Sequence, residues 1–308
     1  MEPLVSVIIP NYNHAKFLKQ RFDSVLKQTY QKFEIIVLDD KSNDDSIDII
    51  KQYEGNEHIS HIVFNDKNCG SPFKQWQKGF DLAKGELIWI AESDDACEDS
   101  LLELLVNEFH DDPKCVVAFC KSITINSDGQ MIGEKGMGGS FHMDGLSFIE
   151  KYLYRYCYIS NASSAIFKKD TLKEVDSRFT TFRGSGDWLF WIEISKCGNV
   201  AYLDRPLNFF RIHDLNTTSK ELRSGNNEME AIAIYRFMQE KKYVGYKELL
   251  RERIAHIYSI RYGKLHGIFD SKKKNELLKG WKENIFIRII VFGISVFQKY
   301  FGYSIIKR

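Results

Sequence analysis

The chain has 308 residues, of which 44% are hydrophobic and 14% aromatic, so it can bury the core of one large or two ordinary domains. Its 43 lysines and arginines are balanced by 42 aspartates and glutamates, which gives a formal net charge of +1. This balance excludes a protein that binds nucleic acid through its overall charge, and we expect no nucleic-acid partner.

Strands and helices are predicted to alternate over the first hundred residues. Short apolar runs that end in turn or polar residues predict strands at 4–9, 33–38, 59–64 and 87–91. Apolar side chains at helical spacing predict helices at 15–28, near 47–50 and at 72–83. This alternation indicates an α/β fold with a Rossmann-like, mostly parallel sheet flanked by helices.

Two of these strands end in a pair of adjacent aspartates, Asp39-Asp40 and Asp94-Asp95. Right-handed crossovers bring the carboxyl ends of parallel strands to one edge of the sheet, so both pairs are expected at a common site. Carboxylates placed there suit a divalent cation that serves a phosphate-bearing substrate. The alternative for Asp94-Asp95 is a solvated turn that caps the helix predicted to begin near Ser100.

The second part of the chain is less regular. We expect helices at 101–109, 147–158 and 187–196, strands at 116–120 and 163–167, and a mobile glycine-rich loop at 133–139. The segment 202–212 alternates too loosely for an assignment. After residue 219 the pattern turns helical, with periodic apolar positions at 229–239, 246–262 and 272–281.

The cysteines and the N-terminal residues indicate in which cellular compartment the protein is expected. The six cysteines form no C-x-x-C pair and show no zinc-ligand spacing, so we expect reduced thiols in a cytoplasmic protein. Met1-Glu2-Pro3 leads straight into an apolar run, and we expect no secretory signal.

Three segments carry a resemblance to a known family. They are VSVIIPNYN at 5–13, VLDDKS at 37–42, and AKGE at 83–86 leading into SDD at 93–95. In this order and at this spacing they resemble the family 2 glycosyltransferases of the GT-A fold, over about residues 4–215. The resemblance implies an inverting hexosyltransferase that moves a sugar from a nucleoside diphosphate to a hydroxyl of a glycan or lipid-linked saccharide in polysaccharide biosynthesis.

The resemblance and the helical pattern together predict two domains. Residues 1–220 are expected to form the GT-A catalytic domain, with a nucleotide-binding half at about 1–120 and an acceptor half at 121–220. Residues 221–308 are expected to form a helical C-terminal extension.

Several donor-site roles are implied by the resemblance. Asp95 is expected to bind Mn²⁺ or Mg²⁺ directly, with Asp94 turned toward the ribose or a metal-bound water. Asp40 matches the position that accepts a hydrogen bond from the base, Tyr12 the ring that lies against the base, and Pro10 belongs to the same segment. An aromatic face with an acceptor carboxylate favours a UDP-type donor. The alternative for Tyr12 is a loop residue packed on the sheet edge.

The remaining candidates carry the catalytic base, a further metal ligand and a phosphate contact. Asp187 is expected to be the general base, although Gly186 precedes it where the family commonly has glutamate, and helix capping is the alternative. His213 resembles a histidine that completes the metal shell, and imidazole would favour Mn²⁺ over Mg²⁺; a structural histidine is the alternative. Lys74 is expected near the donor phosphates, unless it only lies on a solvated helix face.

The C-terminal stretch is apolar and basic. Ile285–Phe297 contains ten large apolar residues, and lysine and arginine outnumber glutamate by five to one over 281–308. This run falls short of the ~20 residues that a spanning helix needs. We therefore expect 281–306 to form an interfacial helix in peripheral contact with the inner face of the plasma membrane, which would suit a lipid-linked acceptor. The alternatives are docking on the protein's own core or on a second subunit in a homodimer.

Two other function classes stay open at this point. A nucleotidyl or phosphoryl transferase also uses carboxylates at strand ends, but a first strand that ends in Asp-x-Asp or a glycine-rich phosphate loop would favour it, and the sequence has neither. A catalytically silent nucleotide-sugar-binding module would carry the same donor residues without turnover.

Overall fold

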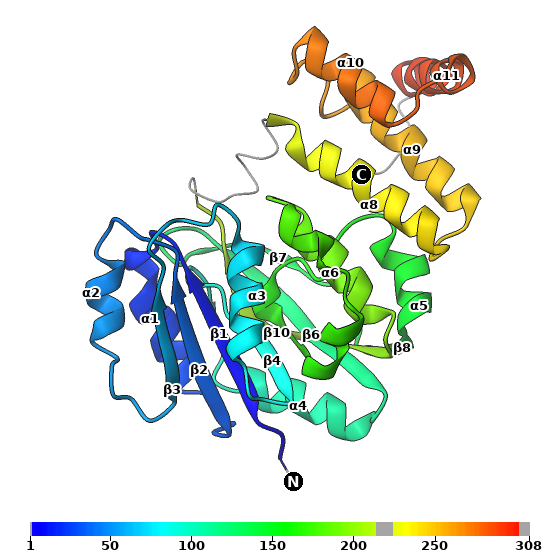
Figure 1. Ribbon diagram of the computed structural model, residues 1–308. Coiled ribbons are helices and arrows are strands. Elements are labelled where there is room, and N and C mark those ends of the chain that lie inside the picture. The colour runs from blue at the N-terminus through cyan, green and yellow to red at the C-terminus, as the bar shows by residue number, and fades with distance from the viewer. Residues whose placement is uncertain (1, 214–223, 302–308) are drawn as a thin grey trace. The chain divides into compact units, whose positions relative to one another are not determined.

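The structure is a computed structural model that describes residues 2–213 and 224–301 (Figure 1). Contacts within the chain divide it into two compact units, Met1–Asp214 and Leu215–Arg308. The first unit contains the sheet, and the second is helical.

The first four strands of the sheet are parallel and run in the order β3-β2-β1-β4. Every residue of β1, β2 and β4 is buried, as expected for apolar strands covered on both faces. The predicted alternation of strands and helices is confirmed here. The strands are β1 (Val5–Asn11), β2 (Phe33–Asp39), β3 (Ile59–Phe64) and β4 (Leu87–Ile90), and the connecting helices are α1 (Ala15–Leu26), α2 (Ser46–Lys51) and α3 (Pro72–Leu82).

The sheet continues from β4 in mixed orientation, in the order β4-β9-β6-β10-β5. The strand β9 is antiparallel to both β4 and β6, whereas β6 and β10 are parallel. The strands β7 and β8 pair with β6 and β10 respectively. These strands are β5 (Ala96–Cys97), β6 (Cys115–Ile125), β7 (Met131–Lys135), β8 (Phe141–Asp144), β9 (Ala165–Lys168) and β10 (Asn199–Arg211).

Three expectations for this half were incomplete or wrong. Part of the expected loop at 133–139 belongs to β7, because Gly133 pairs with Thr124 of β6. The helix expected at 147–158 is one α-helical turn, α5 (Gly145–Phe148), followed by a π-helical turn at Ile149–Leu153. The unassigned segment 202–212 is most of β10, whose strand identity depends on pairing with residues far away in the sequence.

Two further helices complete the first unit, α4 (Leu101–Asp111) and α6 (Gly186–Ser195). All residues of α6 except Asp187 are buried, so the helix is embedded on all sides rather than lying on a surface. Phe190 of α6 stacks on Phe80 with ring centroids 5.6 Å apart and meets Phe167 edge-on at 5.2 Å. This aromatic packing fixes the helix that begins beside Asp187.

The second unit contains four described helices, and the expected helical character of this part is confirmed. Trp281 lies at its centre, 4% exposed and stacked on His256 with ring centroids 4.0 Å apart. His256 in turn contacts Glu228 at 2.8 Å through Nδ1. Among the described residues, no helix has the length and apolar character to cross a membrane. The helices are α8 (Asn226–Lys241), α9 (Tyr246–Arg261), α10 (Ser271–Gly280) and α11 (Ile285–Phe301).

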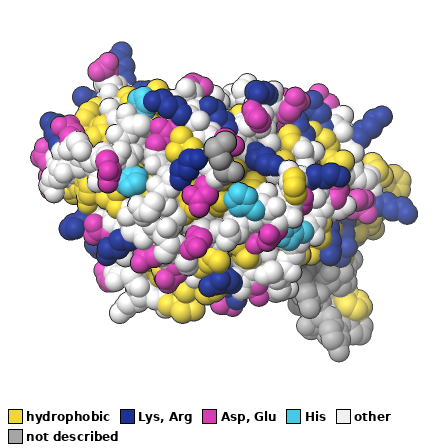
Figure 2. Space-filling view, turned by 90° about the horizontal axis from the view of Figure 1, so that it is seen from below, with side chains coloured by type: hydrophobic (Ala, Val, Ile, Leu, Met, Phe, Trp, Pro, Cys, Tyr) yellow, Lys and Arg dark blue, Asp and Glu magenta, His cyan; other side chains and the backbone are white. Residues whose placement is uncertain are grey.

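The surface carries both acidic and basic side chains. Figure 2 shows one face of the molecule, on which acidic and basic side chains are interspersed among polar and apolar ones. This pattern agrees with the near-zero formal charge of the whole sequence.

Candidate active site

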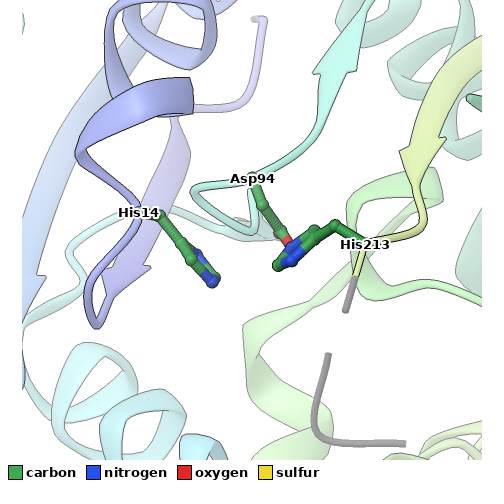
Figure 3. Close-up of side chains that lie close together, drawn as sticks. All are labelled: His14, Asp94 and His213. Carbon is green, nitrogen blue, oxygen red and sulfur yellow. The ribbon is translucent and has the colours of Figure 1, made fainter. Parts of the chain in front are cut away.

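Three side chains from distant parts of the sequence meet at the carboxyl end of the sheet. His14 follows β1, Asp94 lies in the turn between β4 and β5, and His213 follows β10 (Figure 3). His213 Nε2 lies 3.0 Å from Asp94 Oδ2, and the three residues each offer a ligand atom within 4.8 Å of the others. His14 also contacts Ser93 Oγ through Nδ1 at 2.8 Å. One carboxylate and two imidazoles are thus gathered as candidate metal ligands.

Burial and the neighbouring charges of this cluster shift the pKa values of His14, Asp94 and Asp95. Burial lowers the pKa of His14, against the opposing effect of Asp94. Burial alone would raise the pKa of Asp94, but its hydrogen bond with His213 and the charges of both histidines hold that pKa below its ordinary value. Burial, followed by the charge of Asp94, raises the pKa of Asp95 to about 6. Asp94 therefore ionises more readily than Asp95.

Asp95 faces the interior of the protein. Its side chain is 1% exposed, and its Oδ2 accepts hydrogen bonds from Asn161 Nδ2 at 2.8 Å and Ser163 Oγ at 2.7 Å. Its Oδ1 accepts the backbone N–H of Arg211 at 2.9 Å. Asp95 thus accepts hydrogen bonds from protein donors, whereas the carboxylate of Asp94 lies beside the two histidines.

Two buried arginines brace the turn that carries these aspartates. Arg21 of α1 is fully buried, donates from Nε to the carbonyl oxygen of Glu92 at 2.8 Å, and lies 4.0 Å from Asp95 Oδ2. Arg211 at the end of β10 donates from Nε to the carbonyl oxygen of Asp94 at 2.7 Å. Both guanidinium groups thereby fix the backbone of the turn, and neither arginine stands out in the sequence.

The carboxylate of Asp40, which follows β2, accepts several hydrogen bonds from protein groups. Its Oδ1 accepts hydrogen bonds from Asn65 Nδ2 and Gln75 Nε2, both at 2.7 Å, and from the backbone N–H of Cys69 at 2.9 Å. Lys74 is exposed, and its Nζ lies 3.3 Å from the carbonyl oxygen of Cys69. The loop around Cys69 thus brings Asp40 and Lys74 into one neighbourhood.

The loop after β1 contains the expected aromatic residue. Tyr12 is 47% exposed, so its ring is not buried against the sheet edge. Pro10 is buried within β1, opposite Leu38 of β2. Pro10 therefore belongs to the packed strand end that precedes the exposed Tyr12.

Asp187 belongs to a third group, at the start of α6. Its Oδ1 accepts the backbone N–H of Trp188 at 2.8 Å, while the residue at the cap position of the helix is Ser185. A Cβ on Gly186 would lie 2.6 Å from the carbonyl oxygen of Phe179 and 2.6 Å from the ring of Phe73. A side chain at position 186 would therefore require the backbone of Phe179 or the ring of Phe73 to shift.

Sequence comparison identifies the family. The model of the family described as glycosyl transferase family 2 matches residues 6–175, which is more than half of the chain. The chain belongs to glycosyl transferase family 2. It is therefore a glycosyltransferase, as the sequence resemblance implied.

Relatives of this family 2 enzyme align with it over different fractions of its length. Glycosyltransferase GlyG of Streptococcus pneumoniae serotype 4 is 34% identical over 117 residues, which are 38% of this chain and 38% of GlyG. The poly(ribitol-phosphate) beta-N-acetylglucosaminyltransferase TarP of Staphylococcus aureus strain N315 is 26% identical over 300 residues, which cover 91% of this chain and 86% of TarP.

A solved structure confirms the fold of this family 2 enzyme. Residues 1–349 of S. aureus TarS, in complex with UDP-GlcNAc, match with a TM-score of 0.64 at 17% sequence identity. The match covers 90% of this chain and 79% of the TarS chain. The expected GT-A fold, with helices following the sheet, is therefore confirmed.

Proposed function

We propose that this enzyme is a metal-dependent, inverting glycosyltransferase that moves a sugar from a UDP sugar to a hydroxyl of a glycan or lipid-linked saccharide in polysaccharide biosynthesis. The convergence of Asp94 and His213 beside His14, at the carboxyl end of the sheet, carries this proposal. TarP, named for N-acetylglucosamine transfer to poly(ribitol phosphate), and the UDP-GlcNAc complex of TarS support an N-acetylhexosamine on the UDP donor.

The metal is proposed to be Mn²⁺ rather than Mg²⁺. The donor set fits a transition metal, because two imidazoles and one carboxylate suit Mn²⁺ better than Mg²⁺, which prefers oxygen ligands. Asp94 and His213 would hold the ion, with His14 within reach. When bound, the ion supplies positive charge beside the diphosphate, which is the leaving group.

The donor nucleotide is proposed to lie across the ends of β1 and β2. The exposed ring of Tyr12 offers a face on which a uracil can stack. Asp40 would accept a hydrogen bond from an N–H of the base, in exchange for one of the amide donors of Asn65 and Gln75. Lys74, beside the same loop, would contact the donor phosphates.

Asp187 is proposed as the general base. It would take the proton of the acceptor hydroxyl while that oxygen bonds to the anomeric carbon and the bond to the diphosphate oxygen breaks, which inverts the configuration. Two features support the role. The partial positive charge at the N-terminus of α6 favours an ionised carboxylate, and the embedded helix holds that carboxylate in place.

A donor screen tests the proposal. The wild-type protein is incubated with Mn²⁺ and a panel of UDP, GDP and dTDP sugars, and binding is followed by thermal shift while nucleotide release is followed with candidate glycan acceptors. We expect a UDP sugar to raise the melting temperature and to be consumed when an acceptor is added. Binding without turnover on every acceptor would favour a silent nucleotide-sugar-binding module, and preference for another base would contradict the UDP assignment.

A further inference from the structure

The helix α11 carries apolar residues on two opposite faces, and only one of these faces is buried. Ile287 and Val291 are 4% and 0% exposed, and α11 packs against α9 within the helical unit. The opposite side exposes large apolar residues, which we call the apolar face of α11. They are Ile285, Phe286, Ile289, Ile290, Phe292 and Val296, each at least 38% exposed.

The apolar face is wide. At the angular spacing of an α-helix its six residues cover an arc of about 160°. Phe286 is 74% exposed, Ile289 62% and Phe292 58%, so whole side chains and not only their edges meet water. A contiguous apolar patch of this kind marks an interaction surface.

The charges around the helix are positive. Glu283 is the one acidic residue in the sequence from 281 to 308. Its side chain is only 7% exposed and is bonded by Arg261, whose Nη2 donates to Glu283 Oε2 at 2.6 Å. Lys282 and Arg288 are exposed, and Arg288 lies beside the edge of the apolar face at helical spacing, with its Nη2 3.3 Å from Glu283 Oε2. The negative charge is thus turned inward while the positive charges reach solvent.

We propose that the apolar face of α11 lies flat on an anionic lipid surface, with its bulky residues among the acyl chains and Lys282 and Arg288 at the headgroups. A wide apolar arc bordered by basic residues is the pattern of an interfacial helix. A second copy of the chain fits less well, since a helix pair buries a narrow stripe and would leave the flanks of this arc in water. The apolar run Ile285–Phe297 is shorter than the ~20 residues that a spanning helix needs and contains Arg288, which fits a helix that lies on a bilayer.

The test is vesicle binding by the full chain, without nucleotide or acceptor, so that its outcome is independent of the proposed reaction. Phosphatidylcholine vesicles with and without phosphatidylglycerol are sedimented with the wild type and with a Phe286→Ser/Phe292→Ser variant. A Tyr246→Ser/Ile268→Ser variant is the matched control, because these two residues are exposed apolar residues of the same unit outside α11. All three proteins are first compared by circular dichroism and thermal unfolding.

We expect the wild type and the control to bind the anionic vesicles, with at least about tenfold weaker binding for the α11 variant and for neutral vesicles. Equal binding of the α11 variant and the wild type would overturn the proposal. The oligomeric state is measured by light scattering in parallel. A wild-type dimer that the α11 substitutions dissociate, without vesicle binding, would assign the face to a second copy and would also overturn it.

Discussion

The backbone N–H of Arg211 donates to Oδ1 of Asp95 at 2.9 Å, and this bond ties the end of β10 to the turn after β4. His213 follows two residues later, and its Nε2 reaches Asp94 Oδ2 at 3.0 Å. The two adjacent aspartates therefore have different roles. Asp95 holds the strand end in position, and Asp94 presents its carboxylate to the histidine that this strand delivers.

This division predicts opposite outcomes for two substitutions. Asp94→Ala should weaken Mn²⁺ binding by at least about tenfold and lower the free energy of unfolding less than Asp95→Ala does, because Asp94 faces the proposed metal site. Asp95→Ala should lower the free energy of unfolding by about 3–5 kcal/mol, because it leaves the buried guanidinium of Arg21 without its nearby carboxylate. Calorimetric Mn²⁺ titration and chemical unfolding measure the two effects. If Asp95→Ala lost metal binding while keeping wild-type stability, Asp95 would be the ligand after all.

His14 offers a separate test of the metal site. Its ring meets that of His213 edge-on with centroids 5.4 Å apart, and it lies within ligand range of Asp94. His14→Ala should reduce the preference for Mn²⁺ over Mg²⁺ several-fold, because an imidazole favours the transition metal. Competition between the two ions, read by the electron paramagnetic resonance of free Mn²⁺, measures this preference. His110→Ala, at an exposed position on α4, is the control, and an equal preference in both variants would remove His14 from the metal shell.

Much of the nucleotide-binding half could be predicted from the sequence. The strands β1, β2 and β4 are continuous apolar runs that end in polar residues, so their position and their buried, parallel character follow from local pattern. The strand expected at 59–64 matches β3 residue for residue. Asp94 could be singled out because it follows a predicted strand, at the edge where the topology brings ligands together, whereas His213 was implied only by the family resemblance.

The remaining features of the fold and the site depend on contacts between residues that lie far apart in the sequence. The strand β10 is identified by its pairing with β6, and the inward turn of Asp95 depends on Asn161 and Ser163, which precede β9. His14 was missed because a lone histidine after a strand carries no signal until Asp94 lies beside it. The charge state of such groups is likewise set by the folded environment, not by sequence spacing.

A pH-dependent contribution to stability is expected in the helical unit. Burial alone would raise the pKa of Glu283, but its bonds with Arg261 and Arg288 hold that pKa below its ordinary value of 4.5. A carboxyl whose folded pKa is depressed stabilises the fold above its unfolded pKa, and this stabilisation is lost as the pH falls through the folded pKa. Glu283→Gln should therefore lower the free energy of unfolding by about 1–3 kcal/mol at neutral pH.

The difference between wild type and Glu283→Gln should shrink as the pH falls from about 4.5 through the depressed pKa of the folded protein, below which the carboxyl of Glu283 is protonated in both states. Urea unfolding at a series of pH values measures it. Glu276→Gln is the control, since Glu276 is half-exposed on α10. A difference that stayed constant down to the lowest pH would show that Glu283 stabilises the unit by packing and not by charge.

Asp187 and Gly186 carry the last prediction, which concerns the general base. Asp187→Asn keeps the shape of the side chain but cannot accept a proton, so kcat should fall by about 10²–10⁴-fold while UDP-sugar affinity changes less than about threefold. Gly186→Glu, which would create the family's commoner acidic pair, should instead destabilise the protein, because its Cβ would lie 2.6 Å from the carbonyl oxygen of Phe179. Nucleotide release, calorimetric binding and thermal unfolding separate the two effects. Wild-type turnover in Asp187→Asn would assign the base to another residue, since the transfer still requires that the acceptor hydroxyl lose its proton.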